Sequence, residues 1–146
     1  MSRILALDTG DKRIGVALSD PTQTLASPFT IIERVTDEQA IRDILKIVTE
    51  NKVDCIIVGL PHSMDGSIGY QAEKVQLFAG QLEKQIDIPV EYRDERFTTV
   101  TAMRLKQESS PRKLKRNTRY DAMAAAIILQ EYLDEKAAAK TQEEEK

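Results

Sequence analysis

The sequence has very little of the side chains that build disulfides and zinc sites. Of 146 residues, one is a cysteine, Cys55, and one is a histidine, His62. A single cysteine forms no intramolecular disulfide, and one cysteine with one histidine excludes the common structural zinc sites and disfavours a Cys–His nucleophilic site. We therefore expect Cys55 to be a small core residue of a strand and His62 to lie at the surface.

Long apolar runs are also missing. No stretch has the roughly 20 apolar residues of a transmembrane helix, and the apolar stretch at the start, residues 4–7, is too short for a secretory signal. We expect a cytoplasmic protein without membrane contacts. The length predicts one domain, residues 1–136, followed by a disordered charged tail at 137–146. The sequence leaves the oligomeric state open.

The first half of the chain alternates between apolar and polar residues and then changes to a helical period. Arg3 to Asp8 and Arg13 to Ser19 form two predicted strands, spaced as a hairpin, and Phe29 to Ile32 a third. Thr36 and Gln39 have the spacing of a capping box before a helix.

The second half predicts alternating strands and helices. Val53 to Val58 has the pattern of an interior strand, and a helix follows it. Ile88 to Arg93 is the last predicted strand, and further helices are expected over residues 98–107 and from about Arg119. This order predicts an α/β fold with a mixed sheet and helices on both faces.

Three acidic positions fall at the ends of separate predicted elements. They are Asp8, the pair Asp94–Glu95, and Asp121. Carboxylates that converge repel one another, and a divalent cation, Mg²⁺ or Mn²⁺, would neutralise them. Each position has a structural alternative: an Asx-turn at Asp8, helix N-terminal acids at Asp94–Glu95, and a capping box between Thr118 and Asp121.

Two further segments have chemistry that suits phosphate. The net charge is only −3, yet five basic residues and no acid lie between Arg112 and Arg119, a pattern suited to a polyanion such as nucleic acid. A solvated loop is the alternative. The basic residues are Arg112, Lys113, Lys115, Arg116 and Arg119. Turns near the predicted strand ends add a candidate phosphate-binding loop, formed by Gly10, Gly59, Ser63, Gly66 and Ser67.

Four short motifs, in this order, resemble the YqgF/RuvX family of bacterial nucleases in the ribonuclease H-like superfamily. They begin with Leu7-Asp8-Thr9-Gly10 followed by Arg13-Ile14-Gly15-Val16-Ala17, and continue with Val58-Gly59-Leu60-Pro61 followed by Asp65-Gly66. The others are Asp94-Glu95-Arg96-Phe97-Thr98-Thr99 and Asp121-Ala122-Met123-Ala124-Ala125. The resemblance covers residues 4–133.

The resemblance implies a ribonuclease H-like fold, a five-stranded sheet of order 3-2-1-4-5 with strand 2 antiparallel. It also implies an enzyme that hydrolyses ester bonds, a metal-dependent nuclease with catalytic, metal-binding acids at Asp8, Glu95 and Asp121. Strand parity predicts that Asp94 turns away from them. The implied role is maturation of the 5′ end of small-subunit (16S) ribosomal RNA in ribosome biogenesis, with structured RNA as the partner.

Three other functions stay open at this stage. A Holliday-junction resolvase would act on branched DNA, but such enzymes typically carry a fourth acid that nothing beyond Asp121 supplies. A non-catalytic RNA-binding module for ribosome assembly would need only the basic segment. An actin-like ATPase would use Asp8-Thr9-Gly10 as a phosphate loop, but it would require a second lobe for which the chain is too short.

Overall fold

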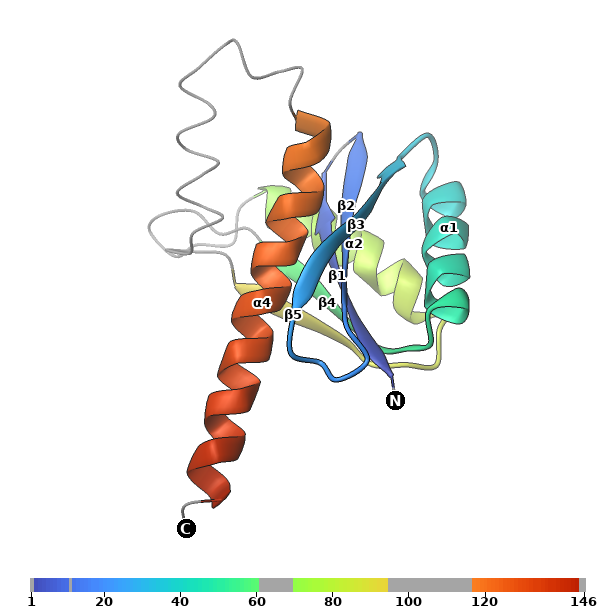
Figure 1. Ribbon diagram of the computed structural model, residues 1–146. Coiled ribbons are helices and arrows are strands. Elements are labelled where there is room, and N and C mark those ends of the chain that lie inside the picture. Colours follow the sequence, from blue (N-terminus) through green and yellow to red (C-terminus); the bar gives the residue numbers. More distant parts are fainter. Residues whose placement is uncertain (1, 11, 61–69, 95–116, 145–146) are drawn as a thin grey trace.

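The computed structural model describes residues 2–10, 12–60, 70–94 and 117–144 (Figure 1). Its first three strands, β1 (Arg3–Thr9), β2 (Arg13–Ser19) and β3 (Ala26–Glu33), form an antiparallel meander. The predicted hairpin is thus confirmed. Strand β3 is longer than the predicted Phe29 to Ile32. Its register shifts opposite Val16 and Ala17, which leaves Phe29 without a partner of its own. Such a bulge on an edge strand accommodates Pro28.

The first helix begins at the residue that the sequence predicts. Helix α1 spans Asp37–Glu50, and Thr36 is its N-cap. The backbone N–H of Gln39 donates to Thr36 Oγ1 over 3.0 Å, and the Gln39 side chain accepts from the backbone of Thr36. The capping box is confirmed, and it satisfies two backbone donors that a helix leaves open.

The remaining strands complete one mixed sheet. Strand β4 (Val53–Leu60) pairs parallel with β1, and β5 (Val90–Asp94) pairs parallel with β4. The order is β3-β2-β1-β4-β5, so the expected order and the antiparallel β2 are confirmed. Strand β4 continues past the predicted end at Val58 to Leu60.

Helices cover both faces of this sheet (Figure 1). Leu5 and Leu7 pack in a core with α1 and α2 (Tyr70–Glu83). The alternate residues Ile4 and Ala6 pack in a second core against α4 (Asn117–Glu144) on the opposite face. Small residues on α4, among them Ala124 and Ala125, let this helix lie close to the strands.

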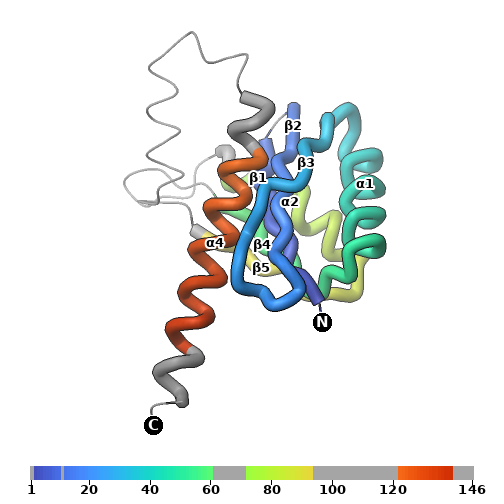
Figure 2. Tube along the Cα trace, viewed as in Figure 1, coloured from blue at the N-terminus to red at the C-terminus, as the bar shows by residue number. Residues whose placement is uncertain are grey.

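Helix α4 has its N-terminal end near the end of β1. Far along the helix, the Gln130 side chain accepts from the Ala26 N–H over 2.9 Å and donates to the Thr24 carbonyl. Ala26 pairs with Ser19, whose hydroxyl accepts from the Ile4 N–H at the start of β1. The other end of α4 therefore lies toward the edge where β1 ends (Figure 1). The coloured part of the α4 tube in Figure 2 follows the same direction across the sheet.

Two expectations about α4 differ from the structure. The helix includes Asn117, earlier than predicted, and it continues to Glu144. Residues 137–144, expected in a disordered tail, are therefore helical, since Ala, Lys, Gln and Glu are strong helix formers. Within the described ranges no helix is both long and apolar enough to cross a membrane. The boundary at residue 136 and the helix expected over 98–107 are untested, the latter lying outside the described residues.

Candidate active site

One edge of the sheet brings together the ends of three strands. Strands β1, β4 and β5 are mutually parallel in the order β1-β4-β5, so their C-terminal ends lie along the same edge. Loops that follow this edge in open α/β sheets are where ligands bind. The N-terminal turns of α4 lie toward this edge on one face, as the direction of the helix requires.

Asp8 occupies the C-terminal part of the central strand β1 and is only 7% exposed. It alternates with Ala6 and so faces α4. Its partner on β2 is Gly15. On β4, Gly59 follows Val58, the partner of Leu7. Glycines therefore flank Asp8 on both neighbouring strands, and neither of these two positions carries a side chain of its own.

The turn after Asp8 depends on Gly10. The Gly10 N–H donates to the Arg13 carbonyl over 2.9 Å. A Cβ atom at Gly10 would lie 2.7 Å from that same carbonyl oxygen, closer than real Cβ atoms approach. The close backbone contact therefore requires glycine, and it sets the direction in which the chain leaves Asp8.

The side chain of Arg34 also holds this turn in place. Its Nη1 donates to the Gly10 carbonyl over 2.8 Å, and its Nε donates to Asp37 Oδ1 over 2.9 Å. The guanidinium lies 4.6 Å from the centre of the Phe78 ring on α2, a cation–π contact. The sequence analysis missed Arg34, although its position just before the N-cap Thr36 places it beside the first acid of α1.

Arg93 makes a second long-range link near the candidate site. It lies on β5 level with Gly59, and its two terminal nitrogens donate to the Glu135 carboxylate of α4 over 2.7 and 2.6 Å. Donating these hydrogen bonds to Glu135 raises the pKa of Arg93, and accepting them lowers the pKa of Glu135. This pair fixes the end of β5 against α4, and the sequence analysis missed it as well.

The predicted acids are only partly described. Asp8 lies at the expected edge, and Asp94 is the last residue of β5. Glu95 lies outside the described residues, as does the side chain of Asp121, so their convergence stays a prediction. The structure disfavours the capping-box alternative for Asp121, because Thr118 lies inside α4 and no acid falls in its first turn. Among the described side chains, no three histidines, cysteines or acids form a metal-sized group.

The phosphate-binding candidates are divided in the same way. Gly10 and Gly59 are described and lie at the edge beside Asp8. The others stay predictions, because they or their side chains lie outside the described residues; they are Ser63, Gly66, Ser67, Arg112, Lys113, Lys115, Arg116 and Arg119. His62 is outside as well. Cys55 is half-buried on β4 and packs at the margin of the α4 core.

Solved structures share this fold at low sequence identity. RuvC of T. thermophilus, solved with a Holliday junction substrate, superposes with a TM-score of 0.57 at 11% identity, over 94% of this chain and 96% of that chain. The Fowlpox virus resolvase, solved with junction DNA, gives a TM-score of 0.54 at 14% identity, over 91% and 97%. The fold is therefore ribonuclease H-like, as the resemblance implied.

Sequence comparisons are more specific. A protein of Roseiflexus sp. (strain RS-1), named "Putative pre-16S rRNA nuclease", is 48% identical over 132 residues, 90% of this chain and 94% of that protein. One of the same name from Crocosphaera subtropica is 44% identical over 145 residues, covering 94% and 98%. The family model described as "RuvX: Holliday junction resolvase" matches residues 2–135. On these matches, the chain belongs to the RuvX family.

Proposed function

We propose that this protein is a metal-dependent nuclease that hydrolyses phosphodiester bonds in structured RNA. Its proposed task is maturation of the 5′ end of the small-subunit ribosomal RNA precursor in the cytoplasm. Relatives that match at least 90% of this chain are named "Putative pre-16S rRNA nuclease". The structural observation that supports it best is the environment of Asp8, a buried carboxylate at the end of the central strand, between two glycines.

A divalent cation fits this environment. Carboxylate oxygens are the ligands that Mg²⁺ and Mn²⁺ prefer, and Asp8 offers such oxygens at the strand-end edge, between glycines of β2 and β4. We propose Asp8, Glu95 and Asp121 as the ligands. Such an ion supplies charge stabilisation at the phosphate and activates the attacking water.

The rest of the chain positions the substrate. The turn held by Gly10 and Arg34 fixes the backbone after Asp8, which limits where the carboxylate lies. The basic residues between Arg112 and Arg119 are proposed to contact the phosphate backbone. Phosphate contacts position a nucleic acid but do not read its sequence. Water then adds across one P–O bond, which leaves a phosphate end and a hydroxyl end.

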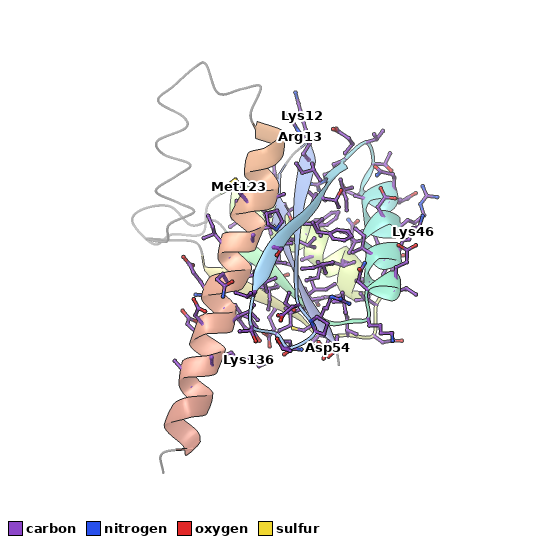
Figure 3. The ribbon with its side chains drawn as sticks, viewed as in Figure 1. Lys12, Arg13, Lys46, Asp54, Met123 and Lys136 are labelled. Carbon is purple, nitrogen blue, oxygen red and sulfur yellow. The ribbon has the colours of Figure 1, made fainter. Side chains whose placement is uncertain are left out.

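The decisive experiment compares substrates and one matched pair of variants. End-labelled RNA spanning the 5′ end of the ribosomal precursor, an unrelated structured RNA and a four-way DNA junction are each incubated with Mg²⁺, with Mn²⁺ or with EDTA. We expect metal-dependent cleavage of the precursor RNA, lost in Asp8→Asn. Asp54→Asn is the control, since Asp54 is exposed at the opposite end of the sheet (Figure 3).

Each other outcome points to a different function. Preferential cleavage of the junction would favour a resolvase. Binding without cleavage by any variant would favour an RNA-binding assembly module.

The basic segment is tested by changing Lys113, Lys115 and Arg116 together to Ala. The slope of log affinity against log salt should become shallower by about 0.7 to 0.9 per lost contact, while the rate at saturating substrate falls much less.

A further inference from the structure

Two adjacent cations stand at the tip of the turn between β1 and β2. Lys12 is exposed and Arg13 is partly exposed, and Figure 3 shows both at the end of the hairpin. Within the described part of the chain, neither side chain forms an ion pair; the salt bridges there involve Arg34 and Arg93. Glu33 lies opposite Arg13 on β3 without forming a salt bridge to it. Asp11 precedes the pair and lies outside the described residues.

Arg13 lies on the same face of the sheet as Asp8. The residues Ile14 and Val16 belong to the core against α1 and α2, so by alternation Arg13 and Gly15 face α4. Gly15 is the cross-strand partner of Asp8. Arg13 is two residues from that partner, roughly 7 Å along the strand. A phosphate group next to one bound at Asp8 is therefore within reach of the Arg13 side chain.

Backbone contacts, and not the two cationic side chains, hold the turn in place. The Gly10 N–H donates to the Arg13 carbonyl, and the Arg34 N–H donates to the Lys12 carbonyl, each over 2.9 Å. The Arg34 side chain donates to the Gly10 carbonyl. The cations thus extend from a fixed backbone, so less freedom is lost when they bind a ligand. Replacing both by Ala removes two charges and leaves the backbone contacts of the turn and the Arg34 hydrogen bond in place.

We propose that Lys12 and Arg13 bind the phosphate backbone of the nucleic acid beside the phosphate that is hydrolysed. This inference rests on the proposed function and adds to it a second contact surface, on a different element from the segment Arg112 to Arg119. Both cations lie at the edge that carries Asp8, in a protein whose net charge is −3. The contacts are to phosphate, so they are independent of base sequence.

The test compares two double variants of equal charge. Lys12→Ala with Arg13→Ala is set against Arg42→Ala with Lys46→Ala, a pair exposed on α1, which covers the other face of the sheet (Figure 1). Figure 3 labels Lys46. Binding to the labelled precursor RNA is measured in EDTA, so that no cleavage occurs, over a range of salt concentrations. Melting temperatures check that each variant is folded.

For the turn variant we expect the slope of log affinity against log salt to become shallower by about 1.4 to 1.8, the value for two lost phosphate contacts. The α1 variant should keep the wild-type slope, and Lys12→Arg with Arg13→Lys should keep most of it. A wild-type slope in the turn variant, or an equal change in the α1 variant, would overturn the proposal.

The same assay separates this inference from the nuclease itself. If the wild-type protein cleaves with Mg²⁺ while the turn variant binds as the wild type does, only the contact surface is wrong. If the wild-type protein binds RNA without cleaving any substrate, and the turn variant shows the shallower slope, the nuclease proposal fails while the contact surface stands. A wild-type protein that binds no nucleic acid overturns both.

Discussion

The guanidinium of Arg34 donates a hydrogen bond to the carbonyl oxygen of Gly10 over 2.8 Å. The two residues are 24 positions apart, and the bond joins the corner before α1 to the turn that follows Asp8. Since the same guanidinium also contacts Asp37 and the Phe78 ring, the turn is tied to both helices on that face.

We predict that Arg34→Ala weakens both stability and cleavage. It removes two charge-assisted hydrogen bonds and the contact with Phe78, so the free energy of unfolding should fall by about 1–3 kcal/mol, measured by urea unfolding. The rate at saturating substrate should fall as well, because the backbone after Asp8 is less restrained. Arg42→Ala, an exposed change on α1, should shift stability by less than about 0.5 kcal/mol. An Arg34→Ala protein with the wild-type rate would show that the link is structural only.

A pair of glycine variants tests whether the turn after Asp8 requires glycine at position 10. Gly10→Ala places a Cβ atom 2.7 Å from the Arg13 carbonyl oxygen, so the backbone has to move. We expect lower stability and slower cleavage. Gly80→Ala is the control, because its Cβ meets nothing within 4 Å inside α2. That change should stabilise the protein by roughly 0.5–1 kcal/mol. Equal effects of the two changes would contradict the assigned role of Gly10.

Local patterns predicted much of the fold. The alternation of Ile14, Val16 and Leu18 indicated β2, and Thr36 with Gln39 indicated the start of α1; both signals depend on residues a few positions apart. Strand β3 was predicted too short, since the structure extends it to Ala26 through Pro28, which a bulge at Phe29 accommodates on the edge strand. The order of the strands came from the family resemblance.

The candidate site was less predictable. Asp8 could be found because it ends a strand with a clear apolar pattern. Arg34 and Arg93 could not, since their roles depend on partners 24 and 42 residues away, and an arginine beside a helix start or near a strand end carries no distinctive spacing. The same holds for the glycine opposite Asp8, which is identified only when the strand register pairs Asp8 with Gly15.

Cys55 should react slowly as a nucleophile. Burial raises the pKa of its thiol to about 11, and the charges of Glu91 and Asp54 add to this. At pH 8.5 the folded protein should therefore hold the thiol almost wholly protonated. The rate of alkylation by iodoacetamide should rise about tenfold per pH unit from pH 8 to 10, because only the thiolate reacts. A rate that levels off by pH 9 would show an ordinary thiol. The folded state favours the protonated thiol of Cys55. The free energy of unfolding therefore falls only as the pH rises above the pKa of the thiol in the unfolded chain.

Asp8→Asn should separate metal binding from folding. If Asp8 is a ligand, Mg²⁺ at a hundred times its dissociation constant stabilises the wild-type protein by about 2.7 kcal/mol, seen as a rise in melting temperature. The variant should show a much smaller rise, and its cleavage rate should fall by at least the roughly 10–100-fold that is typical of losing an outer-shell partner of a metal ligand. In EDTA, however, the variant should be as stable as the wild-type protein or more so, because the proposed cluster of acids would have lost one of its repelling charges. Asp54→Asn should keep both the metal-induced rise and the cleavage. The contrary result, full metal-dependent cleavage by Asp8→Asn, would remove Asp8 from the proposed ligands, since an amide cannot replace the charge of a carboxylate.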